Sequence, residues 1–234
     1  MKNKIIVLFS GGIDSTVCLA KAINEVGKDN VLALSIDYGQ NNIKELNAVK
    51  SICKYYDVKN EIIDLKNVFK YSASSLIKNS KYKIPHESYD KQYLKLGPND
   101  NVSTNVSFRN GVFFSICASI AISKKYNIIY NGIHHEDGVA YQLYPDCSEE
   151  FSDYMSKAIY KGSNGKVSLI SPLVEMSKKE IISLGKKLNI PFDKTWTCYE
   201  DNELPCGKCT ACMDRIKGFR ENGLEDVIKY EGVL

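Results

Sequence analysis

The sequence contains no long hydrophobic run. Every apolar stretch is interrupted before it reaches the roughly 18 residues that a membrane-spanning helix needs. The first residues, MKNKIIVLFSGG, place only five apolar side chains between a basic flank and a glycine pair, too few for the apolar core of a secretory signal. We therefore expect a cytoplasmic protein that does not enter a membrane.

The sequence also lacks a strong excess of charge of either sign. Lysine and arginine number 31 and aspartate and glutamate 28, a formal net charge of +3. This excess does not by itself indicate nucleic-acid binding, and we expect no direct nucleic-acid partner. Of the 234 residues 44% are hydrophobic, which excludes a disordered or collagen-like chain. A chain of this length buries roughly 70 to 75% of its unfolded surface, so we expect one globular domain with a small appendage.

Short β-branched runs alternate with segments of helical spacing. They predict strands at residues 4–9, 31–39, 60–65, 127–133 and 166–173. Helices are expected at 13–27, 43–58, 110–126, 148–160 and 177–190, the last with Ser177 as N-cap and Glu180 completing a capping box. Such alternation produces right-handed βαβ units. The predicted fold is therefore α/β, a doubly wound parallel sheet with helices on both faces.

Two segments depart from this alternation. Residues 70–105 are polar and tyrosine-rich with no clear period, which predicts a long loop or a lid. The composition changes again after Pro191, where half of the cysteines follow. We place a main domain at residues 1–192 and a small C-terminal zinc-binding region at 193–234.

The segment Ser10-Gly11-Gly12-Ile13-Asp14-Ser15 lies between the first predicted strand and the first predicted helix. A glycine pair lets backbone amides approach an anion, and the helix N-terminus adds unsatisfied donors and a partial positive charge. The segment matches neither the Walker pattern nor the dinucleotide fingerprint. It predicts a different kind of phosphate-binding loop.

This SGGxDS loop resembles that of the PP-loop ATP pyrophosphatases, which have a HUP-type, Rossmann-like fold. The resemblance implies that the loop holds the pyrophosphate of ATP while a substrate is adenylated. It also implies that Asp14 lies near a magnesium ion carried by the phosphates, and that the end of the second strand lies against the adenine. The ATP-binding residues expected on this basis are Phe9, Ser10, Gly11, Gly12, Ile13, Asp14, Ser15, Thr16, Ser35, Asp37 and Tyr38.

Four of the eight cysteines form a C-x7-C-x2-C-x2-C array: Cys198, Cys206, Cys209 and Cys212. Thiolates at this spacing can share one tetrahedral ion, and Gly207 permits the turn between two of them. A site with four thiolates has no open position, so we expect structural zinc, with an iron-sulfur cluster as the alternative. Trp196 either packs this knuckle against the main domain or stacks on a base. Cys18, Cys53 and Cys117 lie in apolar helical contexts and are expected to be small buried hydrophobes.

Further motifs restrict the resemblance to one family among the PP-loop ATP pyrophosphatases. TWTCY (195–199), PCGKCTACMDR (205–215) and KGF (217–219), together with SGGIDSTVCL at the N-terminus, resemble the 7-cyano-7-deazaguanine synthases, the QueC family. VSFRNG (106–111) is similar to that family's V-P-x-R-N segment, and YPDC (144–147) matches its YPDC. The segment ISPL (170–173), followed by Lys178 or Lys179 and Glu180, is similar to its T-P-L and K-x-E. The resemblance covers nearly the whole chain.

The resemblance implies a ligase that uses magnesium-ATP, 7-carboxy-7-deazaguanine and ammonia to make the nitrile on the route to queuosine. In this scheme the carboxylate attacks the α-phosphate of ATP, ammonia displaces AMP, and a second adenylation converts the amide to the nitrile. Such catalysis depends on positioning and on neutralising phosphate charge. The expected catalytic residues are Asp14, Arg109 and Asp146.

The planar fork of Arg109 suits the α-phosphate or the substrate carboxylate, although a salt-bridged arginine is the alternative. His134 and His135 follow a predicted strand end, where open α/β sheets bind ligands, although histidine pairs on loops are often merely exposed. Cys147 could form a thioester, a role we rank below substrate contact. The expected substrate-binding residues are Arg109, Asn110, His134, Glu136, Asp137, Asp146 and Cys147.

Three other functions stay open at this point. QueC-like proteins of anti-phage systems join a deazaguanine to a protein amino terminus, and such a protein substrate is the main alternative. A tRNA thiolase of the same superfamily would be expected to carry an RNA-binding domain or catalytic cysteines near the ATP site. A non-enzymatic nucleotide-binding module would bind ATP without releasing AMP. A homodimer is expected from the family resemblance.

Overall fold

The computed structural model describes residues 2–97, 100–134 and 143–231. Its framework is a five-stranded parallel sheet in the order β3-β2-β1-β4-β5. The strands are β1 (Ile5–Leu8), β2 (Val31–Asp37), β3 (Lys59–Asp64), β4 (Ile128–Tyr130) and β5 (Ser168–Ile170). The strand order reverses at β1, and open sheets of this kind bind ligands outside the carboxyl ends of the strands at such a reversal.

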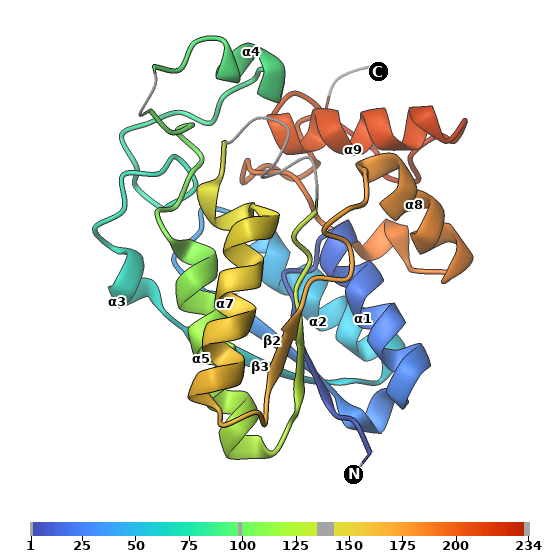
Figure 1. Ribbon diagram of the computed structural model, residues 1–234. Coiled ribbons are helices and arrows are strands. Elements are labelled where there is room, and N and C mark those ends of the chain that lie inside the picture. Colours follow the sequence, from blue (N-terminus) through green and yellow to red (C-terminus); the bar gives the residue numbers. More distant parts are fainter. Residues whose placement is uncertain (1, 98–99, 135–142, 232–234) are drawn as a thin grey trace.

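Helices cover both faces of the sheet, which confirms the predicted fold class (Figure 1). α5 and α7 lie on one face and α1 and α2 on the other, where α8 packs against α1 and α9. The α-helices are α1 (Ile13–Val26), α2 (Lys44–Tyr56), α3 (Lys66–Phe69), α4 (Tyr89–Tyr93), α5 (Arg109–Lys124), α7 (Glu149–Gly162), α8 (Lys178–Lys187) and α9 (Thr210–Glu221). Short 3-10 helices are η1 (Lys28–Asn30), η2 (Pro145–Cys147) and η3 (Phe192–Lys194).

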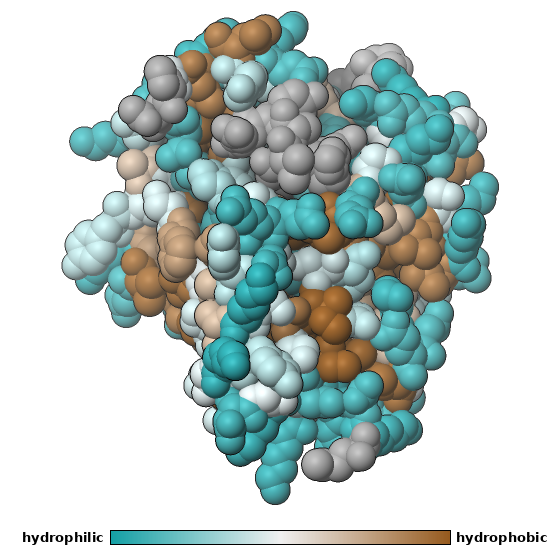
Figure 2. All heavy atoms as spheres, in the orientation of Figure 1, coloured by the Kyte–Doolittle hydropathy of each residue, from teal (hydrophilic) through white to brown (hydrophobic). Residues whose placement is uncertain are grey.

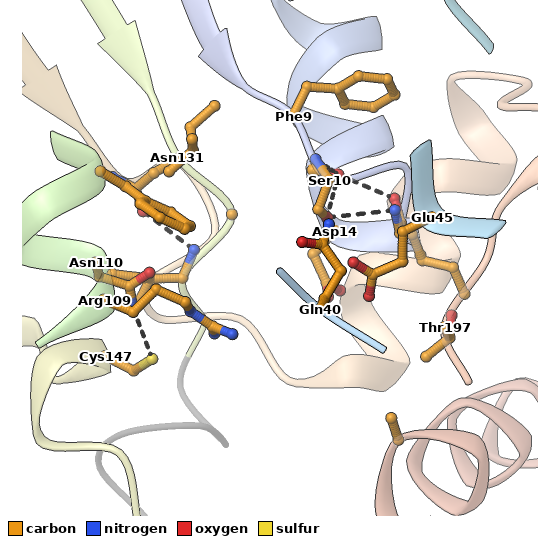
Figure 3. A pocket seen from close by; sticks show the side chains of 18 of the residues that line it. Phe9, Ser10, Asp14, Gln40, Glu45, Arg109, Asn110, Asn131, Cys147 and Thr197 are labelled. Carbon is orange, nitrogen blue, oxygen red and sulfur yellow. Dashed lines mark hydrogen bonds between the residues drawn. The ribbon is translucent and has the colours of Figure 1, made fainter. Parts of the chain in front are cut away.

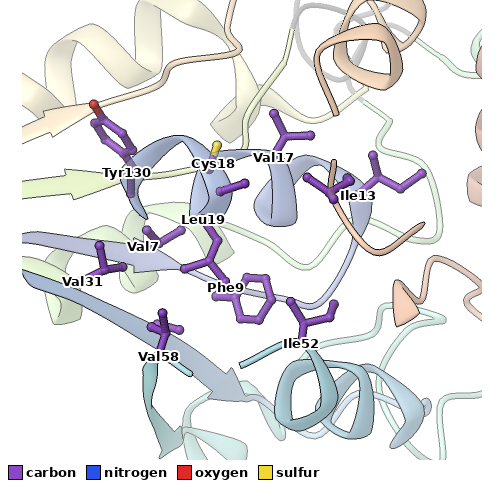
Figure 4. Packing of buried hydrophobic residues seen from close by; sticks show 14 of the residues in the cluster. Val7, Phe9, Ile13, Val17, Cys18, Leu19, Val31, Ile52, Val58 and Tyr130 are labelled. Carbon is purple, nitrogen blue, oxygen red and sulfur yellow. The ribbon is translucent and has the colours of Figure 1, made fainter. Parts of the chain in front are cut away.

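The alternation of side chains along β1 divides the core into two layers. Ile5 and Val7 join Leu19 of α1 on one face (Figure 4), whereas Ile6 packs with Phe114 of α5 on the other. These side chains are almost completely buried, and truncating such a residue to alanine costs about 2–5 kcal/mol. The two layers fix the sheet that carries the functional loops.

The three separate cysteines are buried as predicted, with exposed fractions of 0% for Cys18, 4% for Cys53 and 0% for Cys117. Cys18 and Cys53 belong to the layer under α1 and α2, and Cys117 belongs to the opposite layer. Burial raises the pKa of Cys53 to about 12, so this thiol is inert at neutral pH.

Strands β4 and β5 fall furthest short of the predicted ranges, with three residues each. After Tyr130 the chain leaves the sheet, although the amide of Asn131 still donates to the carbonyl of Ile170 at 3.2 Å. His134 and Leu173 meet at an isolated bridge. The residues between Tyr130 and His134 thereby turn away from regular pairing at the edge where β1 ends.

The start of α8 has the predicted capping box. The Ser177 hydroxyl accepts from the amide of Glu180 at 3.3 Å, and the Glu180 carboxylate accepts from the amide of Ser177 at 2.8 Å. Residues 70–105 are mostly irregular, as predicted, but they include α4. Among the described residues, no helix is long and apolar enough to cross a membrane. The face shown in Figure 2 is mostly hydrophilic, with apolar residues in separate groups.

Candidate active site

A cavity of about 260 Å³ lies at the carboxyl ends of β1, β2 and β4. Its wall combines the loop after β1, the end of β2, the residues after β4, the first turns of α2 and α5, and part of the C-terminal region. Figure 3 shows Arg109, Asn110 and Cys147 on one side and Ser10, Asp14 and Glu45 on the other. The cavity therefore occupies the reversal point of the sheet.

The loop between β1 and α1 turns sharply at Gly11, which has a φ of +81°. A Cβ there would lie 3.0 Å from the carbonyl oxygen of Glu45 and 3.0 Å from the amide nitrogen of Val49, both in α2. The hydroxyls of Ser10 and Ser15 lie 3.1 Å apart within the loop. Because α1 starts directly after this turn, its first amides have no acceptor within the helix and can bind an anion.

Lys178 joins the phosphate loop to two other elements. Its ammonium Nζ donates to Asp14 Oδ1 at 2.7 Å and lies 3.0 Å from His134 Nε2 and 3.5 Å from Asp214 Oδ2. Burial alone would raise the pKa of Asp14, but the Lys178 ammonium and the hydrogen bond that it donates hold this pKa below its usual range. Asp14 is therefore an anion at neutral pH.

Arg109 stands in the first turn of α5. Its guanidinium donates to the Tyr38 hydroxyl at 3.3 Å and lies 5.5 Å from the centre of the Tyr38 ring. Burial raises the pKa of Tyr38 to about 12, even though the nearby Arg109 charge opposes this shift. Tyr38 is thus a neutral phenol beside a fixed cation.

Asn110 is held by the turn that contains Asp146 and Cys147. Its backbone amide donates to Asp146 Oδ2 at 2.8 Å. Its side-chain amide donates to the Asp146 carbonyl and to Cys147 Sγ, both at 3.1 Å. Asp146 therefore orients Asn110 and the start of α5, while Asn110 and Cys147 face the cavity.

Glu45 contributes a carboxyl from the first turn of α2. Burial raises the pKa of this carboxyl to about 7, against the opposing charge of Arg109. Gln40, in the loop after β2, lines the same part of the wall. The cavity thus holds a carboxyl that can gain or lose a proton near neutral pH.

The four cysteines of the C-terminal array are brought together as predicted. Their sulfur atoms all lie within 4.8 Å of one another, and all four side chains are buried. The amides of Glu200 and Cys206 both donate to Cys198 Sγ at 3.3 Å, which favours the thiolate form of a metal ligand. Four ligands at a Zn–S distance of about 2.3 Å would have their sulfurs about 3.8 Å apart, so the array fits one tetrahedral ion.

The cysteine cluster adjoins the cavity. The backbone amide of Trp196 donates to the Gly11 carbonyl at 3.0 Å, and the indole nitrogen donates to the Cys198 carbonyl at 2.9 Å. Trp196 thus connects the cysteine cluster to the phosphate loop, in agreement with the packing interpretation, and it also lines the cavity. Gly207 has a φ of +68° and makes the expected turn.

The sequence matches the family model for queuosine biosynthesis protein QueC over residues 4–223. The chain belongs to the QueC family. Its described relatives include a 7-cyano-7-deazaguanine synthase of Desulfotalea psychrophila, 38% identical over 98% of this chain and 99% of that protein. The synthase of Pseudoalteromonas translucida is 34% identical over 99% of this chain and 100% of that protein. A third synthase, from Thermoplasma volcanium, is 36% identical over 98% of this chain and 92% of that protein.

All three relatives are named 7-cyano-7-deazaguanine synthases, which is the activity that the sequence motifs predicted. Their names indicate an enzyme. None of them favours the protein-conjugating alternative. Among solved structures, the U34-tRNA thiolase NcsA of Methanococcus maripaludis, determined with its [4Fe-4S] cluster, has a TM-score of 0.53 at 18% identity. The match covers 94% of this chain and 67% of that one, and it supports the fold.

Most of the predicted QueC-family site residues lie in the cavity wall. They are Phe9, Ser10, Gly12, Ile13, Asp14, Ser15, Ser35, Tyr38, Arg109, Asn110, His134 and Cys147. Glu136 and Asp137, like His135, fall outside the described residues. The predicted contacts of these two acidic residues therefore stay predictions.

Four other predicted residues do not line the cavity: Gly11, Thr16, Asp37 and Asp146. Gly11 faces α2, and the Thr16 hydroxyl donates to the Gly12 carbonyl at 2.7 Å. Asp37 accepts from Lys66 Nζ at 2.7 Å and from the amide of Gly39 at 3.2 Å.

The wall also contains residues for which the sequence motifs predicted no role, including Gln40, Glu45, Lys178, Tyr199 and Asp214. A signal for Lys178 was present in α8, whose buried residues include Ile181, Ile182 and Gly185 at helical spacing from it. Lys179 falls on the exposed face. The periodicity of α8 therefore distinguishes the two lysines that the family motif left open.

Proposed function

We propose that this chain is an ATP-dependent ligase that converts 7-carboxy-7-deazaguanine and ammonia to 7-cyano-7-deazaguanine, with release of AMP and pyrophosphate. The observation that carries the proposal is that the phosphate loop lines a cavity. The chain that contains this loop matches named synthases over their full length. The cavity also contains cations suited to phosphate and carboxylate, and neutral donors beside them.

The first half of the reaction activates the carboxylate. A carboxylate oxygen attacks the α-phosphorus of ATP, the bond from that phosphorus to the bridging oxygen breaks, and pyrophosphate leaves with the electron pair. The amides at the start of α1 would hold the departing pyrophosphate, and Asp14 would face the magnesium ion carried by ATP. Arg109 would hold the substrate carboxylate or the α-phosphate through its two parallel donors.

The second half forms the nitrile. Ammonia adds to the acyl carbon, AMP leaves, and loss of a proton gives the amide. The amide oxygen then attacks a second ATP, and breaking its C–O bond while two N–H protons are lost gives the nitrile and a second AMP. Asn110 and Cys147 would contact the base, and Asp146 would keep Asn110 in place through its two contacts. Tyr38 and Ser35 would lie beside the adenine.

We further propose that the four cysteines hold structural zinc. The burial of all four sulfurs and the amide donors around them support a closed site, which leaves no position for a substrate. When bound, the ion would fix the knuckle that carries Thr197 and Tyr199 into the cavity wall. The free cysteines elsewhere are in keeping with a reducing compartment, and we propose the cytoplasm.

The test is a product analysis with purified, zinc-loaded protein, 7-carboxy-7-deazaguanine, magnesium-ATP and ammonium. We expect two AMP per nitrile by mass spectrometry of the base and chromatography of the nucleotides. AMP with only the amide, or turnover that requires an added protein amine, would replace this proposal with amide formation or protein conjugation. ADP as the nucleotide product would exclude adenylation.

A further inference from the structure

Two tyrosines from distant parts of the chain meet at the wall of the cavity. Tyr89 is the first residue of α4, in the mostly irregular segment between β3 and α5, and Tyr199 directly follows Cys198. Their hydroxyl oxygens lie 3.4 Å apart, and both side chains line the cavity. Both are half-buried, as expected of side chains at the border between a cavity and solvent. The pair therefore gives one side of the cavity an aromatic wall.

This wall adjoins the groups that would hold the substrate. Tyr89 packs against the core layer that contains Cys147 and Tyr144. Tyr199 is near enough to the Arg109 guanidinium for the two groups to interact electrostatically. In Figure 3, Arg109 and Cys147 lie on the same side of the cavity, away from Asp14. A carboxylate held by Arg109 would therefore bring its attached ring within reach of both tyrosines.

Tyr89 is held in place by contacts outside the cavity. Its ring meets the ring of Tyr144 edge to face, with the ring centres 6.0 Å apart and the planes at 89°. The hydroxyl of Tyr144 is in turn 2.6 Å from the hydroxyl of Thr104. Gln92, one turn after Tyr89, is buried and donates to the Thr210 hydroxyl at 2.8 Å. A side chain that is fixed before a ligand arrives loses less entropy on binding.

The proposed reaction brings two planar rings into the cavity, the adenine of ATP and the base of the substrate. The adenine is expected at the end of β2, beside Tyr38, which leaves the wall of Tyr89 and Tyr199 for the base. A fused heteroaromatic ring has an apolar face and a polar edge. Tyrosine suits both, because its ring contacts the face and its hydroxyl donates to or accepts from the edge.

We propose that Tyr89 and Tyr199 form the subsite for the heteroaromatic base of the substrate, and this inference rests on the proposed function. The two rings contact the base, and the two hydroxyls, which now face each other, bind its polar edge. The segment that carries α4 is thereby part of the substrate site. The subsite contributes to the affinity for the base and does not contribute to the affinity for ATP.

Tyr89→Ala tests this role, because Tyr199 adjoins the cysteine cluster and its substitution could disturb that cluster as well. Tyr93→Ala is the matched control, since Tyr93 lies in the same helix, is 47% exposed and does not line the cavity. Loss of one aromatic contact to a base typically weakens binding about 5- to 150-fold. In substrate-dependent exchange of labelled pyrophosphate into ATP, we expect the KM for 7-carboxy-7-deazaguanine to rise by that factor, with less than about twofold change in the KM for ATP.

Two further substitutions and the thermal unfolding midpoint separate binding from folding. Tyr89→Phe keeps the ring and should recover most of the affinity for the base. Tyr89→Leu keeps apolar bulk against Tyr144 without an aromatic face, so it should fold even if Tyr89→Ala does not, and its KM for the base should rise.

The inference is overturned if Tyr89→Ala and Tyr93→Ala have the same KM for the base. It is also overturned if Tyr89→Ala raises the KM for ATP as much as the KM for the base. A Tyr89→Leu variant with a wild-type melting temperature and a wild-type KM for the base would overturn it as well.

Failure of the proposed function would be visible in the wild type, which would then show no exchange with 7-carboxy-7-deazaguanine. In that case the same base is titrated calorimetrically into the wild type, Tyr89→Ala and Tyr93→Ala. Weaker binding by Tyr89→Ala alone would support the subsite independently of the reaction. Equal binding by all three proteins, or no binding by the wild type, would reject it.

Discussion

Gly11 fixes the turn of the phosphate loop against α2. Its positive φ is costly for any residue with a side chain, and a Cβ would press on two backbone atoms of α2 that cannot move independently. The neighbouring Gly12 has a φ of −79°, and a Cβ there would meet no atom closer than 3.5 Å. The two glycines of the motif therefore have different structural requirements.

We predict that Gly11→Ala lowers the free energy of unfolding by about 2 kcal/mol or more, from left-handed strain and overpacking together. Gly12→Ala should lower it by less than about 1 kcal/mol, since it replaces only an N-cap glycine. Urea denaturation of both variants measures the difference. Equal losses in the two variants would show that the close approach of Gly11 to α2 does not limit this turn.

The sequence predicted the positions of some site side chains but not of others. The spacing of Cys206, Cys209 and Cys212 was sufficient to predict that their sulfurs meet, because two-residue gaps put sulfurs on one side of a tight turn. Glu45 carries no motif and reaches the cavity only because α2 packs against Gly11. The family resemblance implied that Asp37 contacts ATP, but Asp37 bonds Lys66 and the amide of Gly39 and does not line the cavity.

At the level of elements, long periodic segments were predictable, whereas a helix without a clear hydrophobic period was not. The alternating pattern gave all five strands and five of the helices, because hydrophobic period follows directly from which face is buried. Helix α4 lies in the segment predicted as a loop, and its Gln92 is held by a buried hydrogen bond to Thr210 at 2.8 Å. Such a tertiary contact leaves no periodic signal in the sequence.

The segment around α4 packs on the C-terminal region. Besides Gln92, His86 lies 2.9 Å from the Glu200 carboxylate, and the hydroxyls of Tyr89 and Tyr199 are 3.4 Å apart. Both tyrosines line the cavity. The segment between Cys198 and Cys212 therefore supports both the wall of the cavity and the segment around α4.

Removing the proposed metal ion should destabilise both the cysteine region and the segment around α4. Structural metal sites contribute free energy of folding, and loss of several kcal/mol corresponds to a fall in Tm of roughly 10 °C for a chain of this size. We predict this fall after chelation, with faster amide exchange in residues 86–92 and 196–214 and loss of AMP formation. Re-addition of zinc should restore all three.

Elemental analysis of the untreated protein should give one zinc per chain. About four iron and about four sulfide ions per chain would identify a [4Fe-4S] cluster instead. Unchanged exchange in residues 86–92 after complete metal removal would show that α4 does not depend on the cysteine region.

For the molecule as a whole, the boundary predicted at residue 192 stays an interpretation. The C-terminal region supplies cavity residues such as Asp214, and Phe219 of α9 belongs to the same core layer as Val7 of β1. The homodimer expected from the family resemblance likewise stays a prediction.

If one cavity adenylates the substrate twice, as we propose, oxygen atoms of the substrate must pass into AMP, and isotopic labelling follows them. With both carboxylate oxygens of 7-carboxy-7-deazaguanine labelled with ¹⁸O, each activation should carry one labelled oxygen into AMP. We predict two singly labelled AMP per nitrile, with no label in pyrophosphate, by mass spectrometry. Label in inorganic phosphate or pyrophosphate, or unlabelled AMP, would contradict attack on the α-phosphorus and with it the proposed function of the site.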